Sequence, residues 1–127
     1  MTRNLCKFSE IEGHTIESIV NESTRLVIQC DGGTWFELEH GQQCCEDVRI
    51  EDVTGDFEDL IGSPILVAEE ATNADGPEPA DAESYTWTFY KLATIKGYVT
   101  IRWLGESNGY YAEDVDCYRT DPTVVAR

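Results

Sequence analysis

The residues in this sequence that could bind an ion or react are concentrated between His40 and Leu66. The first part of this stretch, HGQQCCE, contains His40 and the adjacent cysteines Cys44 and Cys45. Imidazole and thiolate are ligands of zinc, which usually takes cysteines separated by about two to four residues. Adjacent cysteines in an extended chain point to opposite sides, so a zinc site here would need a kink and a distant further ligand. We therefore rank a structural role for these three residues first, a zinc site second and a reactive thiol third.

The same stretch holds the densest run of acids in the chain, seven carboxylates between Glu46 and Asp59. The run does not match the pattern of an EF-hand calcium loop. It is typical of a solvated acidic face or of a surface that binds a basic partner. Trp35 shares one face of its predicted strand with Glu37 and Glu39, which predicts an exposed ring of the kind found at interfaces. The candidate partner-binding residues are Trp35, Glu46, Asp47, Glu51, Asp52, Asp56, Glu58 and Asp59.

The charge balance narrows the class of partner. The chain of 127 residues has 25 acids against nine lysines and arginines, a formal net charge of -16. Such a surface repels nucleic acid and anionic membrane, so we expect no direct binding to either. A basic protein fits this charge, although solubility alone would also account for it. A homo-oligomer is compatible with the sequence.

No set of residues typical of an enzyme is present. Only His14 and His40 could serve as a base for a nucleophile, and no elbow motif surrounds either one. Glycine-rich phosphate loops and dinucleotide fingerprints are also missing from the sequence. We therefore expect a non-enzymatic protein with no cofactor, zinc being the one alternative.

The sequence has no apolar run long enough to span a bilayer, and its first residues lack the apolar region of a signal peptide. These observations predict a cytoplasmic protein whose five cysteines are reduced.

Alternating apolar and polar residues predict most of the secondary structure. Strands at 24–30 and 34–40 would form a hairpin around Asp31-Gly32-Gly33. A short strand follows at 47–51, one helical turn at 56–61 and a buried strand at 65–68. Aromatic and β-branched residues favour strands at 84–94 and 97–104, and Asn108-Gly109 favours a second hairpin with a return strand at 110–118.

These elements predict one domain over 1–127 that is mainly β, α+β at most. We expect seven or eight antiparallel strands in a curved sheet or sandwich, with about one helical turn, a mobile acidic loop at 72–83 and a frayed tail at 119–127. The predicted core is Leu26, Ile28, Phe36, Leu38, Val99, Ile101 and Trp103. The acids of 46–59 should lie on one exposed edge, with Val48, Ile50, Phe57, Leu60 and Ile61 turned inward.

Three sequence elements resemble those of a family of small uncharacterised bacteriophage and prophage proteins. They are H-x-Q-x-C-C-E, I-E-D-x-x-G-D and W-T-F-Y…G-x-S-N-G-Y-Y, within residues 11–118. The resemblance implies phage origin and no particular chemistry. The leading hypothesis is an acidic accessory protein that binds and modulates a basic host protein. One alternative is a module that binds or cleaves a nucleotide-like signal near Cys44, Cys45 and Arg102; the other is a metal-binding protein that uses His40, Cys44 and Cys45.

Overall fold

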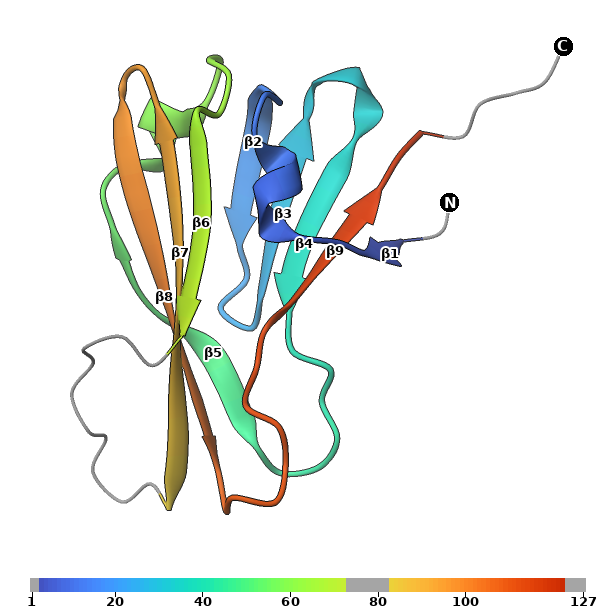
Figure 1. Ribbon diagram of the computed structural model, residues 1–127, viewed down its shortest axis with the longest axis vertical. Coiled ribbons are helices and arrows are strands. Elements are labelled where there is room, and N and C mark those ends of the chain that lie inside the picture. The colour runs from blue at the N-terminus through green and yellow to red at the C-terminus, as the bar shows by residue number, and fades with distance from the viewer. Residues whose placement is uncertain (1–2, 73–82, 123–127) are drawn as a thin grey trace, which may run out of the picture.

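Two antiparallel sheets face one another in the computed structural model, which describes residues 3–72 and 83–122 (Figure 1). The strands, in chain order, are β1 (Asn4–Leu5), β2 (Ile16–Asn21), β3 (Arg25–Cys30), β4 (Trp35–Glu39), β5 (Asp47–Thr54), β6 (Val67–Thr72), β7 (Ser84–Thr94), β8 (Gly97–Ser107) and β9 (Asp116–Thr120). Three short 3-10 turns accompany them, η1 (Phe8–Ile11), η2 (Asp31–Gly33) and η3 (Phe57–Leu60). The prediction of a mainly β sandwich in one domain is confirmed. Within the described residues, no helix is long and apolar enough to cross a membrane.

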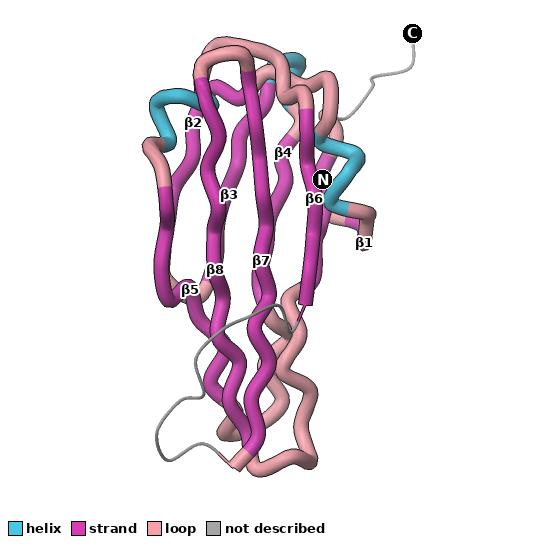
Figure 2. Tube along the Cα trace, turned by 60° about the vertical axis from the view of Figure 1, so that its left-hand side comes forward, coloured by secondary structure: helices cyan, strands magenta, loops and turns pink. Residues whose placement is uncertain are grey.

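The strand order is β1-β9-β4-β3-β2 in the larger sheet and β5-β8-β7-β6 in the smaller one. The hairpin of β7 and β8 is the longest part of the fold, and its two strands run the length of the molecule (Figure 2). The sheet with more strands has the shorter strands, and it leaves the lower end of this hairpin without a facing strand (Figure 1). The loops at 40–46 and 108–115 lie there instead.

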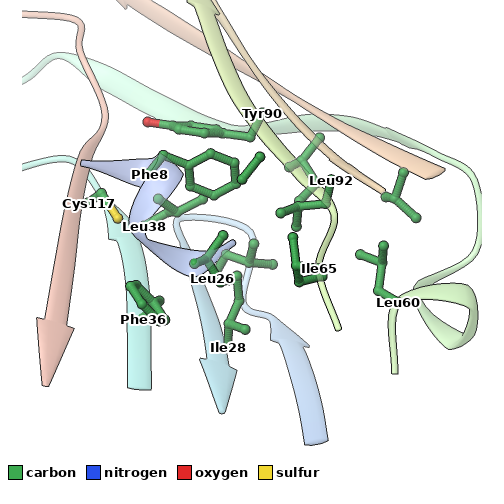
Figure 3. Packing of buried hydrophobic residues seen from close by; sticks show 14 of the residues in the cluster. Phe8, Leu26, Ile28, Phe36, Leu38, Leu60, Ile65, Tyr90, Leu92 and Cys117 are labelled. Atoms are coloured by element: carbon green, nitrogen blue, oxygen red, sulfur yellow. The ribbon is translucent and has the colours of Figure 1, made fainter. Parts of the chain in front are cut away.

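The core fills the space between the sheets. All seven residues predicted to form it are at most 1% exposed. Leu60, Ile65, Tyr90 and Leu92 join them from the smaller sheet and its loops (Figure 3). Alternation explains the agreement, since every second residue of β3, β4 and β8 points to the same face.

The turn η1 covers one side of the sandwich beside β6. Phe8 and Ile11 are buried, and the Phe8 ring lies against Tyr90 with centroids 4.6 Å apart (Figure 3). The Glu12 carboxylate accepts a hydrogen bond from the backbone N–H of Ala68, which attaches this segment to β6.

The predicted return strand at 110–118 is wrong. After β8 the chain forms a loop, and the last strand, β9, pairs with β4 and β1 in the other sheet. Glu113 causes the difference, because its carboxylate accepts hydrogen bonds from Thr86 and Ser107 on the inner face of β7 and β8. Gly105 leaves room for it, since a Cβ atom there would collide with the Glu113 backbone.

Other boundaries also differ from the prediction. β5 is longer than expected and continues to Thr54 through a register shift after Ile50. The predicted strand at 65–68 begins only at Val67. Thr72 belongs to β6, not to the predicted acidic loop, and 73–82 lie outside the described residues. The predicted frayed tail starts too early, because Arg119 and Thr120 belong to β9.

Candidate functional site

The segment from His40 to Glu46 connects β4 to β5 at the lower end of the sandwich in Figure 1. The Nδ1–H of His40 donates to the main-chain carbonyl of Asp114 at 2.7 Å, and its Nε2–H donates to the Glu46 carboxylate at 2.7 Å. The side chains of His40 and Glu46 are only 4% and 0% exposed. Two donors on one ring make His40 an imidazolium, so the contact is a buried ion pair.

The loop wraps around the carboxylate of Glu46. The backbone N–H groups of Gln43 and Cys44 donate to it at 2.9 and 2.8 Å, and the Gln42 amide donates to the Glu46 carbonyl at 2.6 Å. The hydrogen bond from His40, joined by these backbone donors, outweighs burial and lowers the pKa of Glu46 to about 2. Burial alone would lower the pKa of His40, but the bonds to Glu46 and Asp114 outweigh it, and the pKa of His40 is raised.

One prediction about this segment is wrong, and the zinc site, the second-ranked alternative, stays a hypothesis. Glu46 was expected on the exposed acidic edge, yet it is buried because it pairs with His40 from the neighbouring strand end. His40 was a candidate zinc ligand, yet both of its ring nitrogens are already engaged by Asp114 and Glu46. Across residues 3–72 and 83–122, no three His, Cys, Asp or Glu side chains are grouped so that they could hold a metal ion.

Cys44 and Cys45 form an exposed pair on the outside of the same loop. Their Sγ atoms are 2.7 Å apart, so the chain has here the kink that brings two adjacent cysteines to one side. The loop is not extended here, because Glu46 draws in the N–H of Cys44. Hydrogen bonds from Cys45 and then from the Tyr111 hydroxyl lower the pKa of Cys44, while the same contact with Cys44 raises the pKa of Cys45. Chemically, this arrangement is a surface dithiol.

The acidic edge lies further along the chain and is defined here as Asp47, Glu51, Asp52, Asp56, Glu58 and Asp59. The first three belong to β5, an edge strand of the smaller sheet, and the others belong to η3 and its cap. All six are exposed except Asp59, which is half-buried. The residues expected to point inward do so: Val48 and Leu60 are buried, and Ile50, Phe57 and Ile61 pack against the core.

The charge of the acidic edge is unevenly compensated. Arg49 contacts Asp47 at 2.7 Å and Glu51 at 3.2 Å, and it also pairs with Glu106 of β8. At the other end Asp56 accepts a hydrogen bond from the backbone N–H of Glu58, an N-cap that leaves its charge in place. The part of the edge around η3 is therefore the more strongly negative.

Two large apolar side chains are exposed on the hairpin turn next to η3. Ile95 and Tyr98, at the tip of the β7–β8 hairpin, are 85% and 64% exposed. A Cβ atom on Gly55 would touch the Tyr98 carbonyl, and one on Gly97 would touch the Asp59 side chain, so the hairpin tip and the acidic turn are neighbours. Neither residue was among the candidate partner-binding residues predicted from the sequence. The signal was present, since an isoleucine in the Thr94–Gly97 turn is not one of the residues that a turn requires.

Trp35 is separated from this surface. It lies on β4 in the larger sheet and is 36% exposed. Its expected acidic neighbours are occupied, because Glu37 pairs with Arg25 and Glu39 pairs with Arg3. The structure therefore does not bring Trp35 together with the acidic edge.

Two tryptophans of the smaller sheet, next to or near Arg102, are enclosed and so offer no open surface for a ligand. Trp87 is 4% exposed and has the Arg102 guanidinium 4.7 Å from its ring centroid, and Trp103 is fully buried. A cavity of about 300 Å³ does open on the smaller sheet near Phe89. It is lined by Glu69, Glu70, Ala71, Phe89, Lys91 and Thr100.

Comparison with known proteins gives one match. A family model described as "Domain of unknown function (DUF7448)" matches residues 9–117. No curated protein and no solved structure matches the chain.

Proposed function

The chain belongs to the DUF7448 family, and we propose that it is a non-enzymatic domain that binds a basic protein through the acidic edge. The observation that carries this proposal is the exposure of Ile95 and Tyr98 on the hairpin turn whose backbone adjoins η3. Protein interfaces combine an apolar centre with a polar rim, and this part of the surface has both.

The electrostatics favour a cationic partner. The formal net charge of -16 attracts basic surfaces at a distance, and complementary fields raise association rates and disfavour wrong partners. Near η3 the cation Lys96 uses its ammonium to donate to the Ile61 carbonyl, not to a carboxylate. Asp56 and Glu58 therefore keep their charge available to a partner.

Protection against aggregation accounts for only part of this surface. Charged side chains on an edge strand prevent it from pairing with other sheets, which would explain Asp47, Glu51 and Asp52 on β5. It would not explain why Ile95 and Tyr98 are exposed on a hairpin that is already paired. Binding to a partner explains both features.

We place this activity in a phage or prophage accessory protein that modulates a host protein in the host cytoplasm. The support is the resemblance of its sequence elements to those of phage proteins, together with exposed thiols that suit a reducing compartment.

The test compares two triple variants of equal net charge. One changes the acidic edge, Asp56→Asn, Glu58→Gln and Asp59→Asn; the other changes exposed acids elsewhere, Glu17→Gln, Glu69→Gln and Glu83→Gln. Immobilised wild-type protein should capture a basic protein from bacterial lysate at low salt and release it at high salt. The edge variant should lose this protein and the control variant should keep it. Equal capture by both variants would show that only net charge matters and would refute the docking site.

A small ligand in the cavity near Phe89 is the second candidate function. The Phe89 ring supplies a stacking surface and Lys91 a cation, but Glu69 and Glu70 oppose an anion. We therefore expect an uncharged base or nucleoside in preference to a nucleotide. Thermal shift of wild type and Phe89→Ala with nucleosides and nucleotides tests this, because a bound ligand stabilises only the protein that binds it. No shift of wild type with any compound would exclude it.

A further inference from the structure

The adjacent cysteines Cys44 and Cys45 are close enough to react with one another. Their Sγ atoms are 2.7 Å apart, closer than two sulfur atoms in ordinary contact, and both residues are exposed. Small oxidants can therefore reach both thiols. Neither thiol holds the fold together, because the loop is held by Glu46 through the backbone N–H of Cys44.

We propose that Cys44 and Cys45 form an exchange site that reduces small disulfides and closes into a disulfide between the two adjacent residues. This activity is separate from docking at the acidic edge, which uses neither cysteine.

The two thiols have different roles. Cys44 is hydrogen-bonded to both Cys45 and Tyr111, which favour its thiolate, so it is the attacking group. Its sulfur bonds to one sulfur of the small disulfide, the bond between the two sulfurs of that disulfide breaks, and one small thiol leaves. Cys45 then gives up its proton and attacks the Cys44 sulfur, which releases the second small thiol. One small disulfide becomes two thiols, and the two protein thiols become one disulfide.

The closed form should be easy to reopen. The peptide bond between the two residues is trans, which sets their Cα atoms about 3.8 Å apart. Disulfides usually join Cα atoms about 4.4 to 6.8 Å apart, and shorter spans make the bond more reducible. Closure therefore needs the small disulfide in excess, and a small thiol in excess should restore the open pair, so the site can react repeatedly.

The surrounding charge selects the oxidant. The whole chain has a formal net charge of -16, so an anionic disulfide is repelled. Cystamine, a dication, should react with the protein at least about tenfold faster than oxidised glutathione does. Each rate is divided by the rate at which the same disulfide reacts with 2-mercaptoethanol, an uncharged reference thiol. High salt should reduce this ratio towards unity.

The experiment treats folded protein with cystamine, blocks remaining thiols and maps tryptic peptides by mass. Cys44 and Cys45 fall in the peptide 26–49, together with buried Cys30. Cys6 and Cys117, whose Sγ atoms are 3.1 Å apart, fall in two other peptides, so a bond between them gives a different product. In wild type, the mass of the peptide 26–49 should fall by two hydrogens, and treatment with dithiothreitol should restore it.

The variants assign the roles. Cys45→Ser should stop at a cysteamine adduct on Cys44, and Cys44→Ser should react more slowly than wild type. Tyr111→Phe should slow the attack by Cys44, but the disulfide between Cys44 and Cys45 should still form. Two results would overturn the proposal: a stable adduct on wild type without closure, or loss of two hydrogens from Cys45→Ser, which would mean that Cys30 is the partner.

Discussion

Replacing His40 with glutamine tests whether its contact with Glu46 is a buried ion pair. The His40 side chain is 4% exposed and bonds Glu46 at 2.7 Å. Without the imidazolium, the buried carboxylate keeps the backbone donors of Gln43 and Cys44 and a longer contact, 3.3 Å, from the Gln42 amide. Removing one partner of a buried pair costs about 3 to 5 kcal/mol in the free energy of unfolding. Because backbone donors remain, we expect a loss of about 3 kcal/mol.

The loss should depend on pH in a defined way. The pKa of His40 is raised above its usual 6.5, so its contribution to stability is complete below pH 6.5 and is lost as pH rises through the folded pKa. The pKa of Glu46 is lowered from 4.5 to about 2, so its contribution is complete above pH 4.5 and is lost as pH falls towards 2. The difference between wild type and His40→Gln should therefore be largest between pH 4.5 and 6.5. Above that window it should shrink by up to about 1.4 kcal/mol per pH unit.

Urea unfolding followed by tryptophan fluorescence at several pH values measures this difference. His14→Gln is the matched control, because His14 lies 3.8 Å from Asp31, whose side chain is 57% exposed and so is well solvated. The control should lose less than about 1 kcal/mol. A difference between wild type and His40→Gln that does not change with pH would refute the ion pair and leave only a packing role for His40.

Three further results should follow. Gly105→Ala should lower the free energy of unfolding by about 1 to 3 kcal/mol in urea titrations, because the new Cβ collides with the backbone of Glu113. An unchanged urea midpoint would mean that the loop at 108–115 does not pack against β8. The triple amide Asp56→Asn, Glu58→Gln and Asp59→Asn should stabilise the isolated protein at low salt by up to about 1 kcal/mol, and the gain should vanish at high salt, since it comes from relieved repulsion. A destabilised triple amide would mean that these carboxylates hold the turn together. Asp56→Ala should cost about 1 kcal/mol at high salt, where only the lost cap remains to be measured by thermal unfolding.

The parts of the fold that could be predicted from sequence are those set by local alternation. β7 and β8 were found because aromatic and β-branched residues alternate with polar ones from Ser84 onward. The inward direction of Val48 and Leu60 also followed from local periodicity. These patterns depend on neighbours in the chain, which a single sequence contains.

The parts that could not be predicted depend on contacts between distant residues. Asn108-Gly109 suits a hairpin turn, but Glu113 binds Thr86 and so draws the following segment onto the inner face of β7. Glu46 looks like any other acid in its run, and only the approach of His40 makes it a buried one. The hydrogen bonds that decide both cases offset a desolvation cost that no local pattern records.

Because β9 separates β1 from β4, a growing chain cannot complete the larger sheet until the residues up to Thr120 have left the ribosome. Cys6 and Cys117, which lie side by side in the fold, are 111 residues apart in the chain. Such high contact order is typical of β proteins that fold in milliseconds to seconds. The β2–β3–β4 meander is synthesised early, and until β9 is available the edge of β4 that pairs with it stays unpaired. The larger sheet should therefore be completed late, with a nascent chain that benefits from chaperone protection until β9 has been synthesised.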